Sequence, residues 1–442
     1  MRRIARPYTY GPEPVARCWW AQTVKTPVWP RPAGQLTADV AVIGGGFTGL
    51  SAALHLAEAG EDVALCEAEA PFWGASGRNG GFCCLGGAKA DDAALAWRHG
   101  EDGRRDWHRT ERAAVEFAGG LIDRLGLDVD RHSEGETLLA HRPSDWEAMQ
   151  READDFERDH GMAPRLTPSA DLPAEGMAGP FFGALTKPVG FALNPRKYAS
   201  GLARAAEDAG ARLYAPAPVQ GLARDSDGWR LDLSGAALQA RRVIVATNGY
   251  SSEDVPRWMR ARFMPAASNV IVTRPLTGAE LQAAGWTSAQ MAYDTRQLLH
   301  YFRLMPDNRF LFGMRGGIFD RPRERARLAR QIRADFEAMF PAWKGVETPW
   351  LWSGLVCLTR PLTPFVGAVP GEPGLFAGFG YHGNGVAMGS YAGRLLADLV
   401  RDRAPETIYP AAMRDAPGRF PLGRFRRAAL VPAYAMRARA DR

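Results

Sequence analysis

Residues 38–67 read ADVAVIGGGFTGLSAALHLAEAGEDVALCE. An apolar strand, an alanine-rich helix and a second apolar strand follow one another here, and the first turn carries the pattern Gly44-x-Gly46-x-x-Gly49. Gly44 makes the tight turn, Gly46 lets a pyrophosphate approach the backbone, and Gly49 lets the helix pack closely on the strand. The free N–H groups at the start of the helix are suited to binding the phosphates. The stretch therefore predicts a dinucleotide-binding βαβ unit.

The second strand ends at Glu67, 23 residues after Gly44. A carboxylate at this place accepts hydrogen bonds from a ribose 2′-hydroxyl and repels a 2′-phosphate, which argues against NADP. The motif does not distinguish FAD from NAD, and an ordinary βα turn of an α/β protein remains the alternative.

The composition narrows the class of protein. A chain of 442 residues exceeds what one core usually serves, so we expect two domains. The net charge of +6 is scattered, apart from an excess of arginine after residue 414, where we expect a solvated or self-packed tail rather than a nucleic-acid surface. Five cysteines without metal-ligand spacing indicate neither a disulfide framework nor a metal site, and they fit a reducing cytoplasm.

Neither export nor membrane insertion is expected. Arg2-Arg3 is not followed by an apolar run, as a signal peptide would require. No stretch of about 18 apolar residues predicts a transmembrane helix.

The nucleotide-binding pattern returns after two interruptions. Residues 242–249 form an apolar strand, and residues 375–400 repeat the order of strand, glycine-rich turn and helix. Periodicity predicts a helical region at Asp91–His160, helices at Lys197–Ala209, Arg323–Phe340 and Val386–Val400, and strands at Arg212–Tyr214, Val219–Arg224, Trp229–Leu233, Asn269–Thr273, His300–Leu304 and Phe310–Met314.

Four blocks occur in order along most of the chain: Gly44–Glu67, Gly74–Gly81, Val243–Gly249 and Gly378–Gly385. Together they resemble the FAD-dependent amine and amino-acid oxidoreductases of the D-amino-acid oxidase superfamily, which includes glycine oxidase, sarcosine oxidase and γ-glutamylputrescine oxidoreductase. The segment Gly74–Gly81 is most similar to the γ-glutamylputrescine branch. The resemblance implies FAD as the cofactor. Cys357 lies three residues beyond the position that aligns with a flavin-linked cysteine, so we expect non-covalent binding.

The resemblance also implies where the cofactor lies. The pyrophosphate is expected at the first turn, the adenosine beside the end of the second strand, and the flavin between the second and the last block. The helix after the last block directs its N-terminus at the negative charge of a reduced flavin. The expected cofactor-binding residues are Gly44, Gly46, Phe47, Thr48, Gly49, Glu67, Ala68, Ser76, Arg78, Asn79, Gly80, Gly81, Val219, Ala246, Thr247, Gly380, His382, Gly383, Asn384, Gly385 and Val386.

The expected fold is α/β, with a Rossmann-like FAD-binding domain and a discontinuous α+β substrate domain. The expected segments are 1–36 for an N-terminal arm, 37–95, 191–250 and 352–405 for the FAD-binding domain, 96–190 and 251–351 for the substrate domain, and 406–442 for a basic C-terminal tail.

Oxidation of an amine by a flavin needs a neutral nitrogen, whose lone pair assists the departure of hydride. A pocket of low dielectric constant lowers the pKa of an amine and so supplies this neutral form. We expect Tyr381, His382 and Trp352 to be catalytic residues of such a pocket. Further candidate walls are Phe82, Tyr301 and Phe302, for which a core position is the alternative.

One departure from the superfamily concerns the substrate. The amino-acid oxidases of the superfamily bind the α-carboxylate of the substrate with an arginine. In this chain Val356 stands at the matching position. Ala387 stands where sarcosine oxidases have a carboxylate-binding lysine. Because a buried carboxylate without a cationic partner is costly, we expect an extended amine such as a γ-glutamylated one. Alternatively, Arg303 or Arg315 binds the carboxylate, and the protein oxidises α-amino acids or N-methyl amino acids.

The electron acceptor is expected to be oxygen or a quinone. Sarcosine oxidases carry a lysine on a strand resembling Phe310–Gly313, where this chain has none, although Arg315 follows closely. Two further alternatives remain. A flavin hydroxylase shares the opening motif, and a non-catalytic FAD-bearing subunit or scaffold of a larger complex is the alternative from another class.

Overall fold

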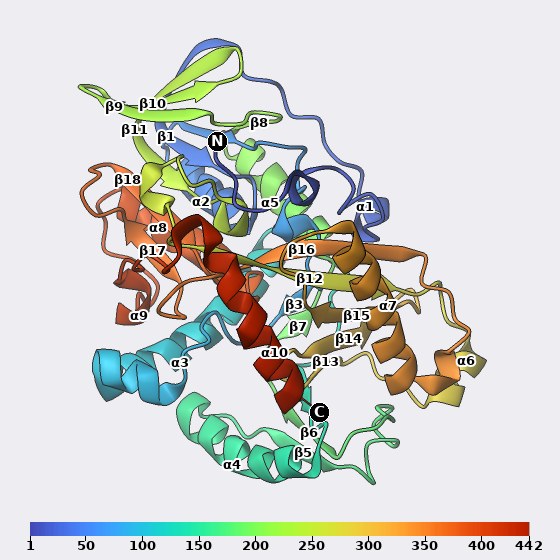
Figure 1. The fold of residues 1–442 in the computed structure, drawn as a ribbon. Coiled ribbons are helices and arrows are strands. Elements are labelled where there is room, and N and C mark those ends of the chain that lie inside the picture. Colours follow the sequence, from blue (N-terminus) through green and yellow to red (C-terminus); the bar gives the residue numbers. More distant parts are fainter. Residues whose placement is uncertain (442) are drawn as a thin grey trace.

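The structure is a computed structural model and describes residues 1–441. Its first large sheet has the order β17-β18-β11-β1-β2-β8, with the β9–β10 hairpin attached to β11 (Figure 1). Parallel pairing joins β1 to β2 on one side and to β11 on the other. The strands are β1 (Gly34–Ile43), β2 (Val63–Cys66), β8 (Arg212–Tyr214), β9 (Gly221–Asp225), β10 (Gly228–Leu233), β11 (Ala236–Val245), β17 (Phe365–Ala368) and β18 (Leu375–Phe379).

The second large sheet has the order β16-β12-β15-β14-β13-β4-β6-β5. Its strands are β4 (Glu136–Leu139), β5 (Arg165–Pro168), β6 (Gly183–Lys187), β12 (Met264–Val272), β13 (Met291–Asp294), β14 (His300–Leu304), β15 (Phe310–Arg315) and β16 (Trp350–Leu358). A short antiparallel pair, β3 (Phe82–Cys83) and β7 (Phe191–Ala192), completes the strands. The helices are α1 (Trp20–Thr23), α2 (Phe47–Glu58), α3 (Asp92–Arg124), α4 (Pro143–His160), α5 (Pro195–Asp208), α6 (Gly278–Ala284), α7 (Pro322–Met339), α8 (Ala387–Val400), α9 (Ala411–Arg414) and α10 (Leu430–Ala440).

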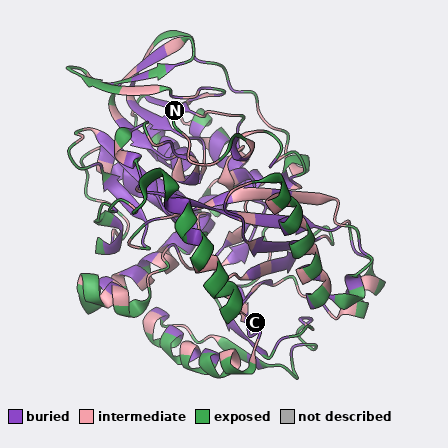
Figure 2. Ribbon diagram, in the orientation of Figure 1, coloured by how far each residue is buried: buried purple, intermediate pink, exposed green. Residues whose placement is uncertain are grey.

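Both faces of the first sheet are covered at its centre, which explains why the central stretches Val40–Ile43, Val63–Cys66 and Val243–Val245 are apolar without interruption. Along β1, Val40 and Val42 join the core under α2, α5 and α8, whereas Ala41 and Ile43 join a second core with the β9–β10 hairpin. Figure 2 shows buried residues in the strands of both sheets and exposed ones along α4, α7 and α10. The α/β class predicted from the sequence is confirmed.

The predicted helical region Asp91–His160 is interrupted. α3 ends at Arg124, and β4 lies between α3 and α4, where it pairs with β13 and β6. The prediction of continuous helix is wrong here because β4 has only four residues and both of its partners are remote in sequence. A pattern of four residues carries too little periodicity to be separated from the flanking helices.

Two elements lie across the expected domain segments. α3 begins just before the segment 96–190 and lies mostly in it, yet its apolar residues share one core with α2, α5 and α8. β16 contains the expected boundary at residue 352 and pairs along its whole length with β12. Through α3 and β16, the segments expected for the FAD-binding domain and for the substrate domain therefore share a core and a sheet.

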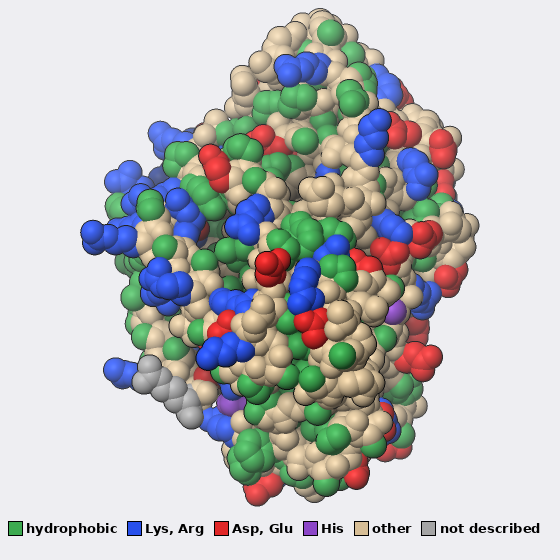
Figure 3. Space-filling model, turned by 90° about the vertical axis from the view of Figure 1, so that its right-hand side faces the viewer, with side chains coloured by type: hydrophobic (Ala, Val, Ile, Leu, Met, Phe, Trp, Pro, Cys, Tyr) green, Lys and Arg blue, Asp and Glu red, His purple; other side chains and the backbone are tan. Residues whose placement is uncertain are grey.

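The two ends of the chain pack on the rest of the molecule. Trp20 is buried, and its ring N–H donates to the Asn79 carbonyl oxygen. α10 crosses the front of the molecule in Figure 1, and its Leu430 enters a cluster with Met264 and Ile318. Figure 3 shows basic and acidic side chains interspersed over one face, with Lys and Arg prevailing along its left edge. Among residues 1–441, no helix combines the length and the apolar character needed to cross a bilayer.

His300 is a buried histidine held between two carboxylates of the second sheet and α7. Its Nδ1 lies 2.9 Å from Asp294 Oδ2 and its Nε2 lies 3.2 Å from Asp335 Oδ2. Burial disfavours the imidazolium, but these two hydrogen bonds outweigh it and raise the pKa of His300 from 6.5 to about 9. The protonated form therefore stabilises the fold.

We expect the free energy of unfolding to fall between pH 6.5 and pH 9. A pKa raised by folding stabilises the native state fully below the unfolded pKa, and this stabilisation is lost as the pH passes the folded pKa. Since one pKa unit corresponds to about 1.4 kcal/mol, the loss should be on the order of 2–3 kcal/mol. Urea unfolding of the wild type and of His300→Gln at both pH values measures it. An equal pH dependence in the two proteins would contradict this role of His300.

Candidate active site

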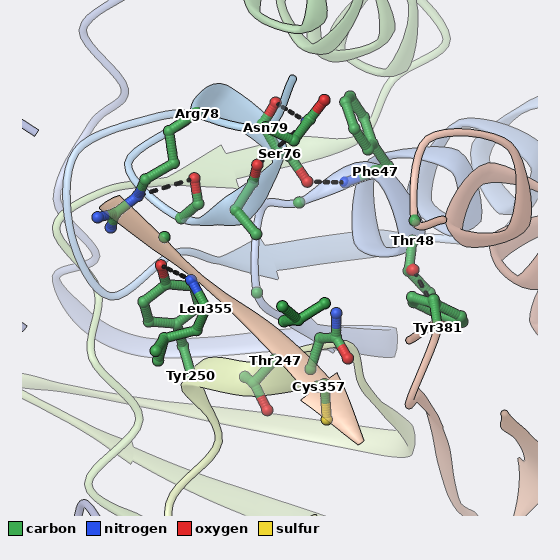
Figure 4. A pocket seen from close by; sticks show the side chains of 18 of the residues that line it. Phe47, Thr48, Ser76, Arg78, Asn79, Thr247, Tyr250, Leu355, Cys357 and Tyr381 are labelled. Atoms are coloured by element: carbon green, nitrogen blue, oxygen red, sulfur yellow. Dashed lines mark hydrogen bonds between the residues drawn. The ribbon is translucent and has the colours of Figure 1, made fainter. Parts of the chain in front are cut away.

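An elongated cavity of about 340 Å³ runs from the glycine turn after β1 to the second sheet. Most of the residues expected at the cofactor line it, and Figure 4 shows ten of the lining residues by name. The expected residues along it are Gly44, Gly46, Phe47, Thr48, Glu67, Ala68, Ser76, Arg78, Asn79, Gly80, Val219, Ala246, Thr247, Tyr381, His382, Gly383, Asn384, Gly385 and Val386. Gly49, Gly81, Gly380 and Trp352 lie outside this lining.

The glycine turn and Glu67 form one hydrogen-bonded unit at the first end of the cavity. The backbone N–H of Gly45 donates to Glu67 Oε2 at 2.8 Å, and that of Glu69 donates to Glu67 Oε1 at 3.0 Å. Burial raises the pKa of Glu67. Each carboxylate oxygen still has a second lone pair, so Glu67 retains the capacity to accept hydrogen bonds from a ligand hydroxyl.

The segment after β2 closes over the start of α2. The backbone N–H of Phe47 donates to Ser76 Oγ at 2.9 Å, which ties the helix to this segment (Figure 4). Asn79 shapes the same segment from within, because its side-chain NH₂ donates to the carbonyl oxygens of Ala75 and Ser76. Since the first four N–H groups of a helix have no partner within it, the start of α2 offers further donors to the cavity.

Arg78 is buried beside the middle of the cavity with an incomplete set of partners. Its Nε donates to the Trp73 carbonyl oxygen and its Nη1 to the Ser353 carbonyl oxygen, at 2.9 and 3.0 Å. Its guanidinium lies over the rings of Trp73 and Tyr250, with the carbon 4.3 and 5.1 Å from their centres. Among residues 1–441, its Nη2 has no hydrogen-bond partner. A cation with a spare buried donor is suited to a polar or anionic ligand group.

His382 is fully buried in the turn before α8 and holds this turn in place. Its backbone has a φ of +50°, its Nδ1 lies 2.8 Å from the Gly87 carbonyl oxygen, and its Nε2 accepts from the Thr359 N–H at 3.2 Å. Burial lowers the pKa of His382 to about 4, so the ring is neutral at physiological pH. With both ring nitrogens engaged, His382 positions the turn.

Tyr381 and Trp352 also use their polar groups on the protein. The Tyr381 hydroxyl lies 2.8 Å from Thr48 Oγ1 and connects the last turn to α2 (Figure 4). The Trp352 ring N–H donates to the Arg78 carbonyl oxygen at 2.7 Å, which places this ring behind the cavity wall. Of the other candidate walls, Phe82 and Tyr301 line the cavity, whereas Phe302 is buried in the core of the second sheet.

The two arginines considered for a substrate carboxylate differ. Arg303 is 1% exposed, and its guanidinium contacts the carbonyl oxygens of Gly80 and Leu193 and the ring of His132. Arg315 lines the cavity and donates one hydrogen bond, to the His382 carbonyl oxygen at 3.1 Å. Only the second of these arginines is therefore available to a ligand of the cavity.

Sequence reasoning missed the polar residues at the second-sheet end of the cavity. Lys89, Glu136 and Tyr293 line this end together with Leu299. They come from the loop before α3, from β4, from β13 and from the loop before β14. The available signal was Glu136 itself, an acidic residue directly before Thr137 and the apolar pair Leu138 and Leu139.

Comparisons with known proteins agree with this arrangement. A model of the family described as FAD dependent oxidoreductase matches residues 39–399. The chain is 32% identical over 401 residues to gamma-glutamylputrescine oxidoreductase of Escherichia coli, and the match covers 91% of both chains. It is 26% identical over 396 residues to glycine oxidase of Geobacillus kaustophilus, covering 85% of this chain and 95% of the relative.

Solved structures show the same fold. The crystal structure of the Geobacillus kaustophilus glycine oxidase superimposes with a TM-score of 0.70 at 21% identity, covering 86% of this chain and 98% of that one. An iminodiacetate oxidase from Chelativorans gives a TM-score of 0.69 at 21% identity, covering 86% of this chain and 100% of that one.

Proposed function

Because the chain belongs to the family of FAD-dependent oxidoreductases, we propose that it oxidises a C–N bond of an extended amine to an imine. The proposed substrate class is a diamine acylated at one end, of the kind that γ-glutamylputrescine represents. The relative from Escherichia coli, which is 32% identical and carries the name gamma-glutamylputrescine oxidoreductase, supports this class.

The residues along the cavity fit FAD. The turn around Gly46 has room for a pyrophosphate only because it lacks a side chain, Glu67 keeps free lone pairs for a ribose, and Arg78 keeps a free buried donor. The start of α8 adds N–H groups at the other end of the proposed flavin position. We propose non-covalent binding, since burial raises the pKa of the nearby Cys357 thiol to about 12 and keeps the thiolate scarce.

Bound FAD supplies the acceptor for the hydride that leaves the carbon beside the nitrogen. The protein contributes the environment. Phe82 and Tyr301 border the cavity and favour the neutral amine, because a low dielectric constant disfavours the ammonium form. Neutral His382 keeps the turn before α8 in one conformation without placing a further charge beside the reacting nitrogen.

Val356 is the observation that carries the choice of an extended amine. It lines the cavity with an apolar side chain at the position where amino-acid oxidases of the superfamily have the carboxylate-binding arginine. A substrate carboxylate next to the reacting carbon would therefore have no arginine to pair with. Each charged hydrogen bond that is lost in this way would weaken substrate binding by roughly 1.5–3 kcal/mol. The polar residues Lys89, Glu136 and Tyr293, which are not among the expected cofactor-binding residues, lie instead at the second-sheet end of the cavity.

We expect γ-glutamylputrescine to bleach the flavin anaerobically and to give a kcat/KM at least about tenfold above those of glycine, sarcosine and D-alanine. Tenfold corresponds to about 1.4 kcal/mol, the lower limit of one charged hydrogen bond. Stopped-flow absorbance with the five compounds glycine, sarcosine, D-alanine, putrescine and γ-glutamylputrescine measures it. A clear preference for the amino acids would contradict the proposal. Bleaching by NAD(P)H alone would indicate a hydroxylase, and no bleaching at all a non-catalytic subunit.

Arg315 favours a second candidate function, the oxidation of α-amino acids or N-methyl amino acids. Its guanidinium lines the cavity beside His382, where it could bind a carboxylate. If the substrate is an extended amine instead, we propose that Arg315 lies beside the place where the electron acceptor reacts. The proposed acceptor is oxygen or a quinone. The cytoplasm is the proposed location, since reduced, unpaired cysteines suit a reducing compartment.

A further inference from the structure

Glu136 is a buried carboxylic acid at the cavity wall without an ion partner. It begins β4, is 2% exposed, and accepts one hydrogen bond from the Tyr293 hydroxyl, at 3.2 Å. Lys187 stands opposite on β6, but its ammonium group pairs with Glu152 at 2.7 Å. Within residues 1–441, no Lys, Arg or His nitrogen lies within 4.0 Å of the Glu136 carboxylate. A buried carboxylate is costly unless a cation or several donors compensate it.

Lys89, from the loop before α3, lines the same cavity. Its pKa is lowered to about 8, chiefly by withdrawal from bulk water and also by Arg315. None of the carboxylates in residues 1–441 lies within 4.0 Å of its ammonium group. One end of the cavity thus presents an acid and a base that are not paired with each other.

We propose that this end of the cavity binds a zwitterionic α-amino acid group of the substrate, with Glu136 on its ammonium and Lys89 on its carboxylate. This inference rests on the proposed function and adds the recognition site for the remote end of the substrate. Neither residue matches a motif of the four cofactor blocks.

The alternative ligand for Glu136 is the reacting nitrogen, and chemistry disfavours it. Hydride transfer needs this nitrogen neutral, whereas a neighbouring carboxylate stabilises the ammonium form. A second, non-reacting ammonium group has no such conflict. A plain diamine would satisfy Glu136 but would bring a positive charge close to Lys89, and a plain carboxylate would leave Glu136 unpaired. A group that carries both charges compensates both residues.

Three substrates separate the two contacts. γ-Glutamylputrescine carries both charged groups, glutarylputrescine lacks the α-ammonium, and 4-aminobutyrylputrescine lacks the α-carboxylate. We expect Glu136→Gln to lower kcat/KM about 10- to 100-fold for γ-glutamylputrescine and 4-aminobutyrylputrescine and to leave glutarylputrescine unchanged. Lys89→Met should lower it similarly for γ-glutamylputrescine and glutarylputrescine and leave 4-aminobutyrylputrescine unchanged. In both variants the change should lie in KM.

Binding without turnover provides an independent measurement. γ-Glutamylbutylamide has the zwitterionic end but no oxidisable amine, and calorimetric titration of the flavin-loaded protein gives its Kd. We expect Glu136→Gln and Lys89→Met each to raise this Kd by about tenfold or more. Glu147→Gln is the matched control, because it makes the same chemical change in an exposed glutamate of α4 that does not line the cavity. Flavin content and melting temperature confirm that each variant is folded.

The outcomes distinguish this inference from the proposed function. Tight binding of γ-glutamylbutylamide that depends on both residues, without oxidation of any amine, would support the binding site and contradict the amine oxidation. An equal effect of Glu136→Gln on all three substrates, or an effect confined to kcat, would overturn the site, because it would place Glu136 at the reacting nitrogen. Unchanged Kd values in both variants would overturn it as well.

Discussion

Gly46→Val is expected to yield a folded protein that does not bind FAD. A Cβ at Gly46 would stand 2.9 Å from Ser76 Oγ, and Ser76 cannot retreat without losing the hydrogen bond from the Phe47 N–H. The remaining methyl groups would occupy the wall that we assign to the pyrophosphate. We expect a colourless protein with a Kd for FAD raised at least about 100-fold, which corresponds to roughly 3 kcal/mol.

Absorbance of the purified protein and fluorescence titration with FAD measure this effect. Gly120→Val is the matched control, because a Cβ at Gly120 meets no atom within 4 Å and α3 is far from the turn in sequence. This control should retain its flavin. A Gly46→Val protein with a full flavin spectrum would contradict the assignment of the glycine turn to the pyrophosphate.

Gly49→Ala is expected to destabilise the fold itself, with or without FAD. A Cβ at Gly49 would stand 1.9 Å from the Gly44 carbonyl oxygen and 3.2 Å from Val42 Cγ1. The first of these atoms belongs to the backbone, so α2 would have to move away from β1. Overpacking of a core costs about 1–3 kcal/mol and occasionally more, and we expect a loss of about 3 kcal/mol or more here.

Thermal unfolding followed by circular dichroism, on protein freed of flavin, measures this loss. Gly278→Ala is its control, since a Cβ at Gly278 meets nothing within 4 Å and the residue begins α6. Alanine is favoured over glycine in helices by about 1 kcal/mol, so this variant should be as stable as the wild type or slightly more so. A Gly49→Ala protein that melted at the wild-type temperature would contradict the claim that α2 packs too closely on β1 to admit a side chain at this position.

The nucleotide-binding elements were predictable because their signals are local. The turn, α2 and β2 follow within thirty residues of one another, and β8 and β14 have the bounds that their patterns predicted. β4 was missed because its register with β13 and β6 depends on residues far along the chain. β16 was missed for the same reason, since it forms by pairing with β12 across the expected boundary.

The candidate site divides in the same way. The residues at its first end belong to glycine-rich turns with fixed spacing, and this spacing encodes their proximity. At its other end, Lys89, Glu136 and Arg315 come from three segments that only the tertiary fold brings together. No spacing rule connects them. The hydrogen bonds of the His382 ring nitrogens could not be predicted either, because their partners, Gly87 and Thr359, lie in two other segments.

The position of β18 in the first sheet has a consequence for biosynthesis. β18 pairs in parallel with β11, through Leu375–Ala377 and Val243–Val245, although well over a hundred residues separate them. During translation, β1, β2, β8, β10 and β11 can assemble early. β10 covers the start of one edge of β11, but the rest of that edge, Val243–Val245, stays open until β18 has left the ribosome. An open apolar strand edge is a template for pairing with other chains. A nascent or truncated chain that ends before Leu375 would therefore depend on chaperones, and cofactor loading would wait for about the last sixth of the polypeptide.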